Sequence, residues 1–168
     1  MLLSIIRHAV NLVLWLLPPT RMLNFRGTLL RLAAIDVGDG ARVCGRGWIY
    51  GRGRLSIGKR SWISPGTEFF THPTAIIQIG PDCDVGPGCS FVTGSHAIGP
   101  PERRAGEGCT ASIIIGAGSW IGAKTLLLGG ITVGQGSIIA AGSVVAESVP
   151  DNCLAAGVPA RAKKDLGH

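Results

Sequence analysis

The sequence contains little charge and few aromatic residues. Only 15% of its 168 residues are Asp, Glu, Lys or Arg, against a typical quarter, and only 5% are aromatic. A disordered chain is excluded because hydrophobic residues reach 46%. The 26 glycines lack the period of three that collagen needs. Because each glycine inside a helix costs about 1 kcal/mol relative to alanine, a helical bundle is disfavoured, and we expect a turn-rich, all-β protein.

Several site motifs are also missing. The five cysteines include no C-x-x-C pair, which indicates a reducing, cytoplasmic setting. Residues 53–59 have the G-x-x-x-x-G-K spacing of a phosphate-binding loop, but Arg60 follows and no helix pattern comes after it. No two histidines have the i, i+4 spacing of helical metal ligands, and we expect no metal. The net charge of +6 is compatible with anionic small molecules, lipid headgroups or nucleic acid and does not choose among them. We expect no nucleic-acid partner.

Residues 1–34 are predicted to be a separate helical segment. Residues 1–17 are almost continuously apolar and end at two prolines, but the run is too short for a transmembrane helix. Its polar residues Ser4, Arg7, His8 and Asn11 fall on one helical stripe, and a second helical stretch is expected over residues 20–34. The two helices either cap the main domain or pack in an oligomer, or they lie on an anionic membrane. On a membrane, four arginines would face the headgroups: Arg7, Arg21, Arg26 and Arg31.

A six-residue period begins at Val37. Large apolar residues recur in five triplets, and a glycine follows the first member of each; we expect these glycines to supply positive φ angles in tight turns. The triplets are Val37/Val43/Ile49, Ile57/Ile63/Phe69, Ile79/Val85/Phe91, Ile115/Ile121/Leu127 and Val133/Ile139/Val145. Three six-residue segments make one triangular coil, and stacked coils bury a shared column of aliphatic side chains. The period therefore predicts a β-helix. Cys83 and Cys89 occupy small inward positions and are expected to be packing thiols.

The repeat divides the chain. We predict a β-helix over residues 35–150, interrupted by a long loop at 92–114, and a C-terminal tail at 151–168. The loop is rich in Gly, Pro and charge and has no period, and such loops on rigid scaffolds are usually functional or disordered. Cations on outward positions of the early coils form either a solvated face or a patch for a phosphate-bearing lipid or acidic glycan. They are Arg42, Arg46, Arg52, Arg54, Lys59 and Arg60.

The repeat with its excursion resembles the left-handed parallel β-helix family of hexapeptide-repeat acyltransferases. The most specific segments are T-G-S-H-A-I-G at 93–99, S-W-I-G-A at 119–123, I-I-A-A-G-S-V-V at 138–145 and A-A-G-V-P-A-R at 155–161. They look like the branch of maltose, galactoside and bacterial polysaccharide O-acetyltransferases. The resemblance implies left-handed coils, a homotrimer with sites between subunits, and acetyl transfer from acetyl-CoA to a sugar or glycan hydroxyl, in surface polysaccharide biosynthesis. With the cysteine pattern, we expect a cytoplasmic protein, peripheral to the inner face of the membrane if residues 1–34 contact it.

The same resemblance assigns the site residues. His96 matches the catalytic histidine, which acts as a general base on the acceptor hydroxyl. The residues that match the acetyl-CoA site are Trp120, Ala123, Ala141, Arg161 and Lys164. Trp120 precedes an inward position and should project outward, and the two cations would meet the CoA phosphates.

Departures from the family pattern concern the acceptor. Glu68 stands where maltose and galactoside relatives have an asparagine that touches the acceptor; it would bind the sugar hydroxyl, orient His96, or be solvated. Ala97 replaces an aspartate of many polysaccharide relatives, and residues 146–147 are Ala-Glu where relatives often have Thr-Lys. Alternative activities are acetylation of serine or a xenobiotic, or a zinc lyase of carbonic anhydrase type, which needs three histidines.

Overall fold

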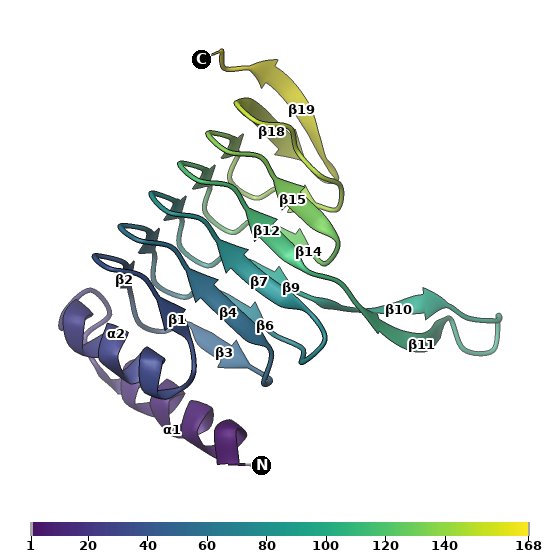
Figure 1. Cartoon of the computed structure of the whole chain (residues 1–168). Coiled ribbons are helices and arrows are strands. Elements are labelled where there is room, and N and C mark those ends of the chain that lie inside the picture. The colour runs from purple at the N-terminus through teal and green to yellow at the C-terminus, as the bar shows by residue number, and fades with distance from the viewer. Residues whose placement is uncertain (1, 168) are drawn as a thin grey trace.

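The computed structural model describes residues 2–167, and most of them form a triangular stack of short parallel strands (Figure 1). Three sheets make its sides. Sheet A contains β1 (Asp36–Val37), β4 (Arg54–Ile57), β7 (Ile76–Ile79), β12 (Ile113–Ile115) and β15 (Ile131–Val133). Sheet B contains β2 (Arg42–Val43), β5 (Trp62–Ile63), β8 (Asp84–Val85), β13 (Trp120–Ile121), β16 (Ile138–Ile139), β18 (Cys153–Gly157) and β19 (Ala160–Asp165). Sheet C contains β3 (Trp48–Tyr50), β6 (Glu68–Phe70), β9 (Ser90–Val92), β14 (Leu126–Leu128) and β17 (Val144–Val145).

The five predicted triplets are confirmed as the core. The first member of each triplet lies on sheet A, the second on sheet B and the third on sheet C, and equivalent members pair in direct register between coils. Every member is at most 8% exposed. Cys83 and Cys89 are buried as expected, and burial raises the pKa of both thiols. The chain is therefore a left-handed parallel β-helix, in which six-residue spacing sends one aliphatic side chain inward from each side.

The glycines that follow the first triplet members do not have positive φ angles, so the reason predicted for them is wrong. A Cβ at Gly116 would lie 2.4 Å from the backbone nitrogen of Gln135 in the next coil, so glycine is needed there for close backbone approach. The positive φ angles come two residues later, at Gly118 and its equivalents. Those equivalents on the first corner are Gly40, Arg60, Asp82 and Gly136.

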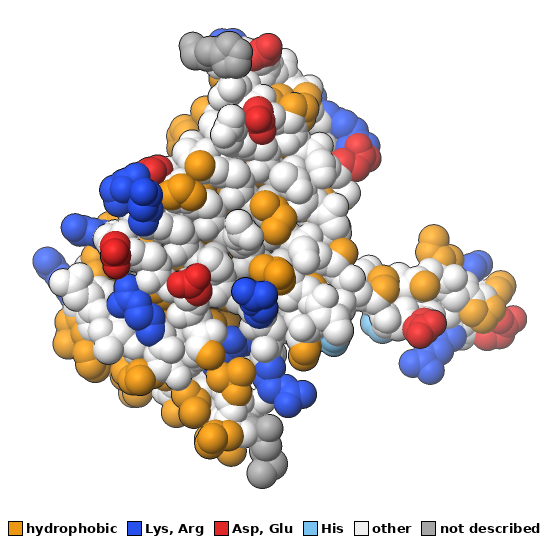
Figure 2. Space-filling model, viewed as in Figure 1, with side chains coloured by type: hydrophobic (Ala, Val, Ile, Leu, Met, Phe, Trp, Pro, Cys, Tyr) orange, Lys and Arg blue, Asp and Glu red, His pale blue; other side chains and the backbone are white. Residues whose placement is uncertain are grey.

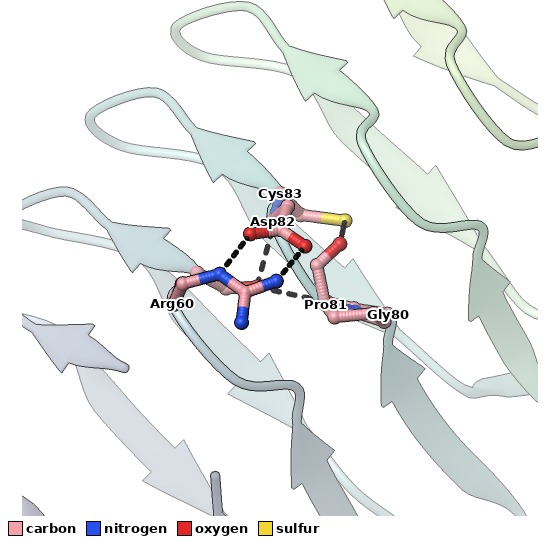
Figure 3. Close-up of polar contacts among 6 residues, drawn as sticks. Arg60, Gly80, Pro81, Asp82 and Cys83 are labelled. Carbon is pink, nitrogen blue, oxygen red and sulfur yellow. Dashed lines mark hydrogen bonds and ion pairs between the residues drawn. The ribbon is translucent and has the colours of Figure 1, made fainter. Parts of the chain in front are cut away.

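At two neighbouring corners this left-handed position is charged rather than glycine. Figure 3 shows the Arg60 guanidinium facing the Asp82 carboxylate of the next coil, and two hydrogen bonds of 2.6 Å join them. The hydrogen bonds from Arg60 hold the pKa of Asp82 below its ordinary value. Behind this pair, the Cys83 thiol donates to the Pro81 carbonyl at 3.5 Å. Exposed ion pairs add little stability, so backbone hydrogen bonds, rather than this pair, hold the corner together.

The N-terminal helices α1 (Leu2–Leu16) and α2 (Leu23–Leu32) cover the first coil (Figure 1). Two residues of the polar stripe of α1 face inward: Arg7 is 3% exposed, and Asn11 exchanges two hydrogen bonds with the backbone of Ile49. Ser4 and His8 of the same stripe are exposed. Arg26 is 1% exposed and donates only to backbone carbonyls. The expectation that Arg7 and Arg26 face headgroups is therefore wrong, because both close the open end of the β-helix. No helix among residues 2–167 has the length and apolar character needed to cross a membrane.

The C-terminal residues predicted as a tail extend the stack. β18 pairs in parallel with β16, and β19 returns antiparallel along β18. Ala155 and Cys153 are buried in the last coil. The hairpin thereby covers the second end of the aliphatic column, as the helices cover the first.

Candidate functional site

The long excursion forms a two-stranded antiparallel hairpin, β10 (Gly94–Ile98) with β11 (Ala105–Thr110), that projects from the corner between sheets C and A (Figure 1). The hairpin forms because this segment has no apolar period to place in the coil. Its strands are largely exposed, and Ile98 is 90% exposed. The hairpin thus carries its side chains away from the core of its own chain.

His96 lies on β10, with its side chain exposed. Its Nδ1 lies 3.0 Å from the Gly106 carbonyl oxygen across the hairpin. A carbonyl can only accept, so Nδ1 carries the proton of the neutral ring and Nε2 keeps a free lone pair. The register is irregular between His96 and Ile98, which brings Gly106 opposite the ring. The backbone thereby fixes the tautomer that a general base needs.

Glu68 lies on the outer face of sheet C, between Trp48 on the coil before and Ser90 on the coil after. It is half-buried, and no hydrogen bond or ion pair joins it to His96 within residues 2–167. Aromatic rings lie next to it: Tyr50 and Phe70 stack with centroids 4.4 Å apart, and Trp48 lies 6.1 Å from Tyr50. The carboxylate therefore borders an aromatic surface.

Trp120 projects from sheet B as predicted and is 55% exposed. It lines a shallow hollow with Trp62, and Asp84 lies between the two tryptophans in the strand register. The apolar ring surfaces on either side of one carboxylate make this the most aromatic part of sheet B.

Ala123 and Ala141 occupy the same corner in successive coils. The amide of Gly142, next to Ala141, donates to the carbonyl of Ala123 at 2.8 Å. Both alanines follow strands of sheet B, so they lie on the same side of the stack as Trp120. Their small side chains leave the corner backbone open to a ligand.

Arg161 and Lys164 lie on β19, which extends sheet B. Both are exposed, and Arg161 forms a 2.9 Å ion pair with Glu147. Glu147 therefore contributes to this region by pairing with a cation, where relatives often have a lysine. Lys164 lies opposite Leu154 in the hairpin register.

Comparison with known proteins adds sequence and structural relatives. A family model for the bacterial transferase hexapeptide, of six repeats, matches residues 112–147. The chain is 28% identical over 129 residues to galactoside O-acetyltransferase of Escherichia coli K12, covering 66% of this chain and 64% of that one. A hexapeptide-repeat acetyltransferase of Vibrio cholerae O1 biovar eltor, solved with acetyl-CoA, superposes with a TM-score of 0.79 at 26% identity, covering 99% and 88%. The polySia specific acetyltransferase NeuO superposes with a TM-score of 0.69 at 29% identity, and the match covers 79% of this chain and 61% of that one.

Residues 112–147 match the bacterial hexapeptide transferases, and the chain as a whole is similar to hexapeptide-repeat acetyltransferases. It spans 49%, 64% and 44% of the length of three curated relatives that it matches.

The hexapeptide-repeat scaffold divides the expected site residues between two sides of one chain. The residues matched to acetyl-CoA lie on sheet B or its corner, whereas His96 extends from the corner of sheets C and A and Glu68 lies on sheet C. Within residues 2–167, no group of three or more His, Cys, Asp and Glu side chains is placed to hold a metal ion. The residues expected to bind acetyl-CoA and those expected to act on the acceptor therefore lie on different faces of one chain.

Sequence reasoning missed the neighbours of these residues in the hexapeptide-repeat coils. Trp62 and Trp120 each precede the second member of a triplet, so the register alone could have placed them in one column. The aromatic surface of Trp48, Tyr50 and Phe70 likewise occupies the outward positions beside inward Ile49 and Phe69. The Gly106 carbonyl could not be found in this way, because the hairpin irregularity decides its position.

Proposed function

We propose that this protein transfers an acetyl group from acetyl-CoA to a hydroxyl group of a sugar or glycan, with His96 as general base. The observation that carries the proposal is the hydrogen bond from His96 Nδ1 to the Gly106 carbonyl on an exposed hairpin. It leaves Nε2 unprotonated and directed by the backbone rather than by another side chain. The acetyl-CoA bound to the Vibrio relative and the sugar acetyltransferases among the relatives support the choice of reaction.

One imidazole first takes and then returns the proton in this transfer. Nε2 takes the proton of the acceptor hydroxyl as its oxygen attacks the thioester carbonyl. The carbon–sulfur bond breaks, and the departing CoA thiolate receives the proton back from the imidazolium. While the ring is charged, the Gly106 carbonyl accepts from Nδ1–H and stabilises it. Proton transfer by a positioned histidine contributes about 10²–10⁴-fold to such a reaction.

We further propose that the working form is a homotrimer. His96 and the sheet B residues lie on different faces of one chain, so a complete site needs the hairpin of one subunit beside sheet B of its neighbour. There Trp120 would border the pantetheine arm, Ala123 and Ala141 would leave room for it, and Arg161 and Lys164 would meet the CoA phosphates.

The acceptor is proposed to be a surface polysaccharide or its precursor, acetylated in the cytoplasm where acetyl-CoA is made. A similarity to a polysialic acid acetyltransferase supports this class. Glu68 supplies a hydrogen-bond acceptor for a sugar hydroxyl, and the stacked rings of Tyr50 and Phe70 supply the apolar surface that a sugar ring face prefers.

Steady-state acetyl transfer to a panel of glycans tests the assignment. His96→Gln should lower kcat/KM about 10²–10⁴-fold and leave CoA binding, measured by calorimetry, unchanged. His72→Gln is the matched control, because His72 is also an exposed histidine with an Nδ1 contact, at 2.9 Å to Thr74, but lies outside the hairpin. Equal turnover by His96→Gln and wild type would remove His96 from the mechanism.

A further inference from the structure

The helical cap presents its apolar side to the outside. On α1, Leu16 is 77% exposed, Trp15 53% and Leu12 46%. Figure 2 shows hydrophobic side chains gathered over this end of the molecule. We name these exposed side chains of α1, α2 and the turn between them the apolar cap face: Leu2, Ile5, Leu12, Val13, Trp15, Leu16, Met22, Phe25 and Leu32. A cap helix normally buries its apolar side. Here Val10 and Leu14 of α1 are buried beside Arg7 and Asn11, but most of its large apolar side chains stay exposed.

Hydrogen bonds fix α1 in this orientation. Arg7 donates to the carbonyls of Ala33 and Gly51 at 3.0 Å, and Asn11 is bonded to the buried edge of β3. Turning α1 to bury Leu12 and Leu16 would carry the guanidinium away from these carbonyls and leave them without donors. Because unpartnered buried polar groups are costly, the apolar cap face stays outside.

The whole net charge of the protein lies beside this face. Residues 1–54 contain eight arginines and two aspartates, whereas residues 55–168 contain eight cations and eight carboxylates, so the +6 excess belongs to the helices and the first coil. Six of these arginines are exposed: Arg21, Arg31, Arg42, Arg46, Arg52 and Arg54. Arg21 and Arg42 line one hollow together with Met22 and Phe25, so cations and exposed apolar side chains border the same hollow.

We propose that the apolar cap face docks on an anionic lipid bilayer, with α1 lying in the interface and the surrounding arginines at the headgroups. A helix of 15 residues is about 22 Å long, too short to cross the hydrocarbon but long enough to bury one side in it. Anionic headgroups complement the arginine rim. A two-fold contact with a second copy of the same face would instead bring two such rims together and repel.

Flotation of the full-length protein with vesicles tests the proposal. Vesicles containing phosphatidylglycerol should bind it, and pure phosphatidylcholine vesicles should bind it far more weakly. Trp15→Gln with Leu16→Gln should lower the partition coefficient at least about 10-fold, since each loses apolar burial. The matched control is Ile98→Gln with Val158→Gln, two apolar residues away from the helices that are 90% and 72% exposed, and it should bind as wild type does.

A second pair separates the charge contribution. Arg46→Gln with Arg52→Gln should weaken binding about 30-fold, because each cation near an anionic surface contributes about 1 kcal/mol. Lys124→Gln with Lys163→Gln removes the same charge elsewhere on the surface and should leave binding unchanged. All four variants change exposed side chains and should keep the wild-type Tm.

Two outcomes overturn the proposal. One is absence of binding to phosphatidylglycerol vesicles, or an equal loss in the variants and their controls. The other is a smaller particle mass in solution for the Trp15 and Leu16 variant, which would make the apolar cap face a contact between copies of this chain. Quenching of Trp15 fluorescence by brominated lipid, lost in Trp15→Phe, would support insertion directly.

Discussion

Replacing Arg26 with methionine should release the helical cap from the β-helix. Arg26 donates to the carbonyls of Leu14, Leu17, Pro18 and Arg21 at 2.9–3.0 Å. Three of these carbonyls follow or end α1, whose last turn has no basic residue of its own. The guanidinium therefore satisfies the free carbonyl end of α1 and opposes its dipole.

The magnitude follows from those four contacts. Each carbonyl that loses its donor costs about 1 kcal/mol, the lower end of the usual range, because three of the four are only partly buried and water can reach them. Methionine recovers about 1 kcal/mol, since a charged guanidinium no longer has to be desolvated. The expected loss for Arg26→Met is about 3 kcal/mol, a large part of a typical domain's stability.

Hydrogen exchange measured by mass spectrometry locates the effect. Amides of α1 and α2 should exchange about 100-fold faster in Arg26→Met, while those of β12 to β16 keep wild-type protection, because the loss is local to the cap. Arg21→Met is the control: its side chain is exposed, and its effect should stay within about 0.5 kcal/mol. Unchanged exchange in α1 of Arg26→Met would refute the reasoning that buried arginine bonds hold the cap.

The repeat and the thiols give two further expectations. Gly116→Ala should lower stability by about 2–3 kcal/mol in chemical denaturation, because its Cβ would meet backbone at 2.4 Å, whereas Gly118→Ala meets nothing within 4 Å and should cost about 1 kcal/mol for its positive φ; equal losses would contradict this division of roles. In a thiol-labelling time course at pH 8, exposed Cys109 should react first and Cys89 only on unfolding, because burial raises the pKa of the Cys89 thiol and keeps it protonated and shielded. Early labelling of Cys89 would mean that the coil opens readily.

The hairpin that carries His96 could be located from the sequence, but its conformation could not be predicted. His96 lies in the one long stretch without a hexapeptide period, and the resemblance of residues 93–99 to the hexapeptide-repeat acyltransferases marked it as a candidate. Its partner could not be predicted, because the Gly106 carbonyl reaches the ring only through an irregular antiparallel register. Trp120 and His96 lie on two faces because the insertion leaves the coil at the corner between sheets C and A, whereas Trp120 lies on sheet B.

The two helices mark a second limit of sequence reasoning. The polar stripe with Arg7 and Asn11 was visible from spacing, but spacing does not say which side of an amphipathic helix faces the protein. The open end of a β-helix exposes backbone carbonyls as well as aliphatic side chains. The side of α1 that carries Arg7 and Asn11 therefore faces this end, and Arg7 and Arg26, expected outside, donate to internal carbonyls.

The order of residues by itself determined the stack, because a large apolar residue at every sixth position can be buried only by repeated coils in register. It also determined where the stack is interrupted and which imidazole stands in the interruption. Only the three-dimensional structure decided the tautomer of that imidazole, the direction in which the N-terminal helices turn their apolar side, and the reason for each glycine. These depend on contacts between segments far apart in the chain, where one backbone carbonyl or one ångström of clearance selects the arrangement.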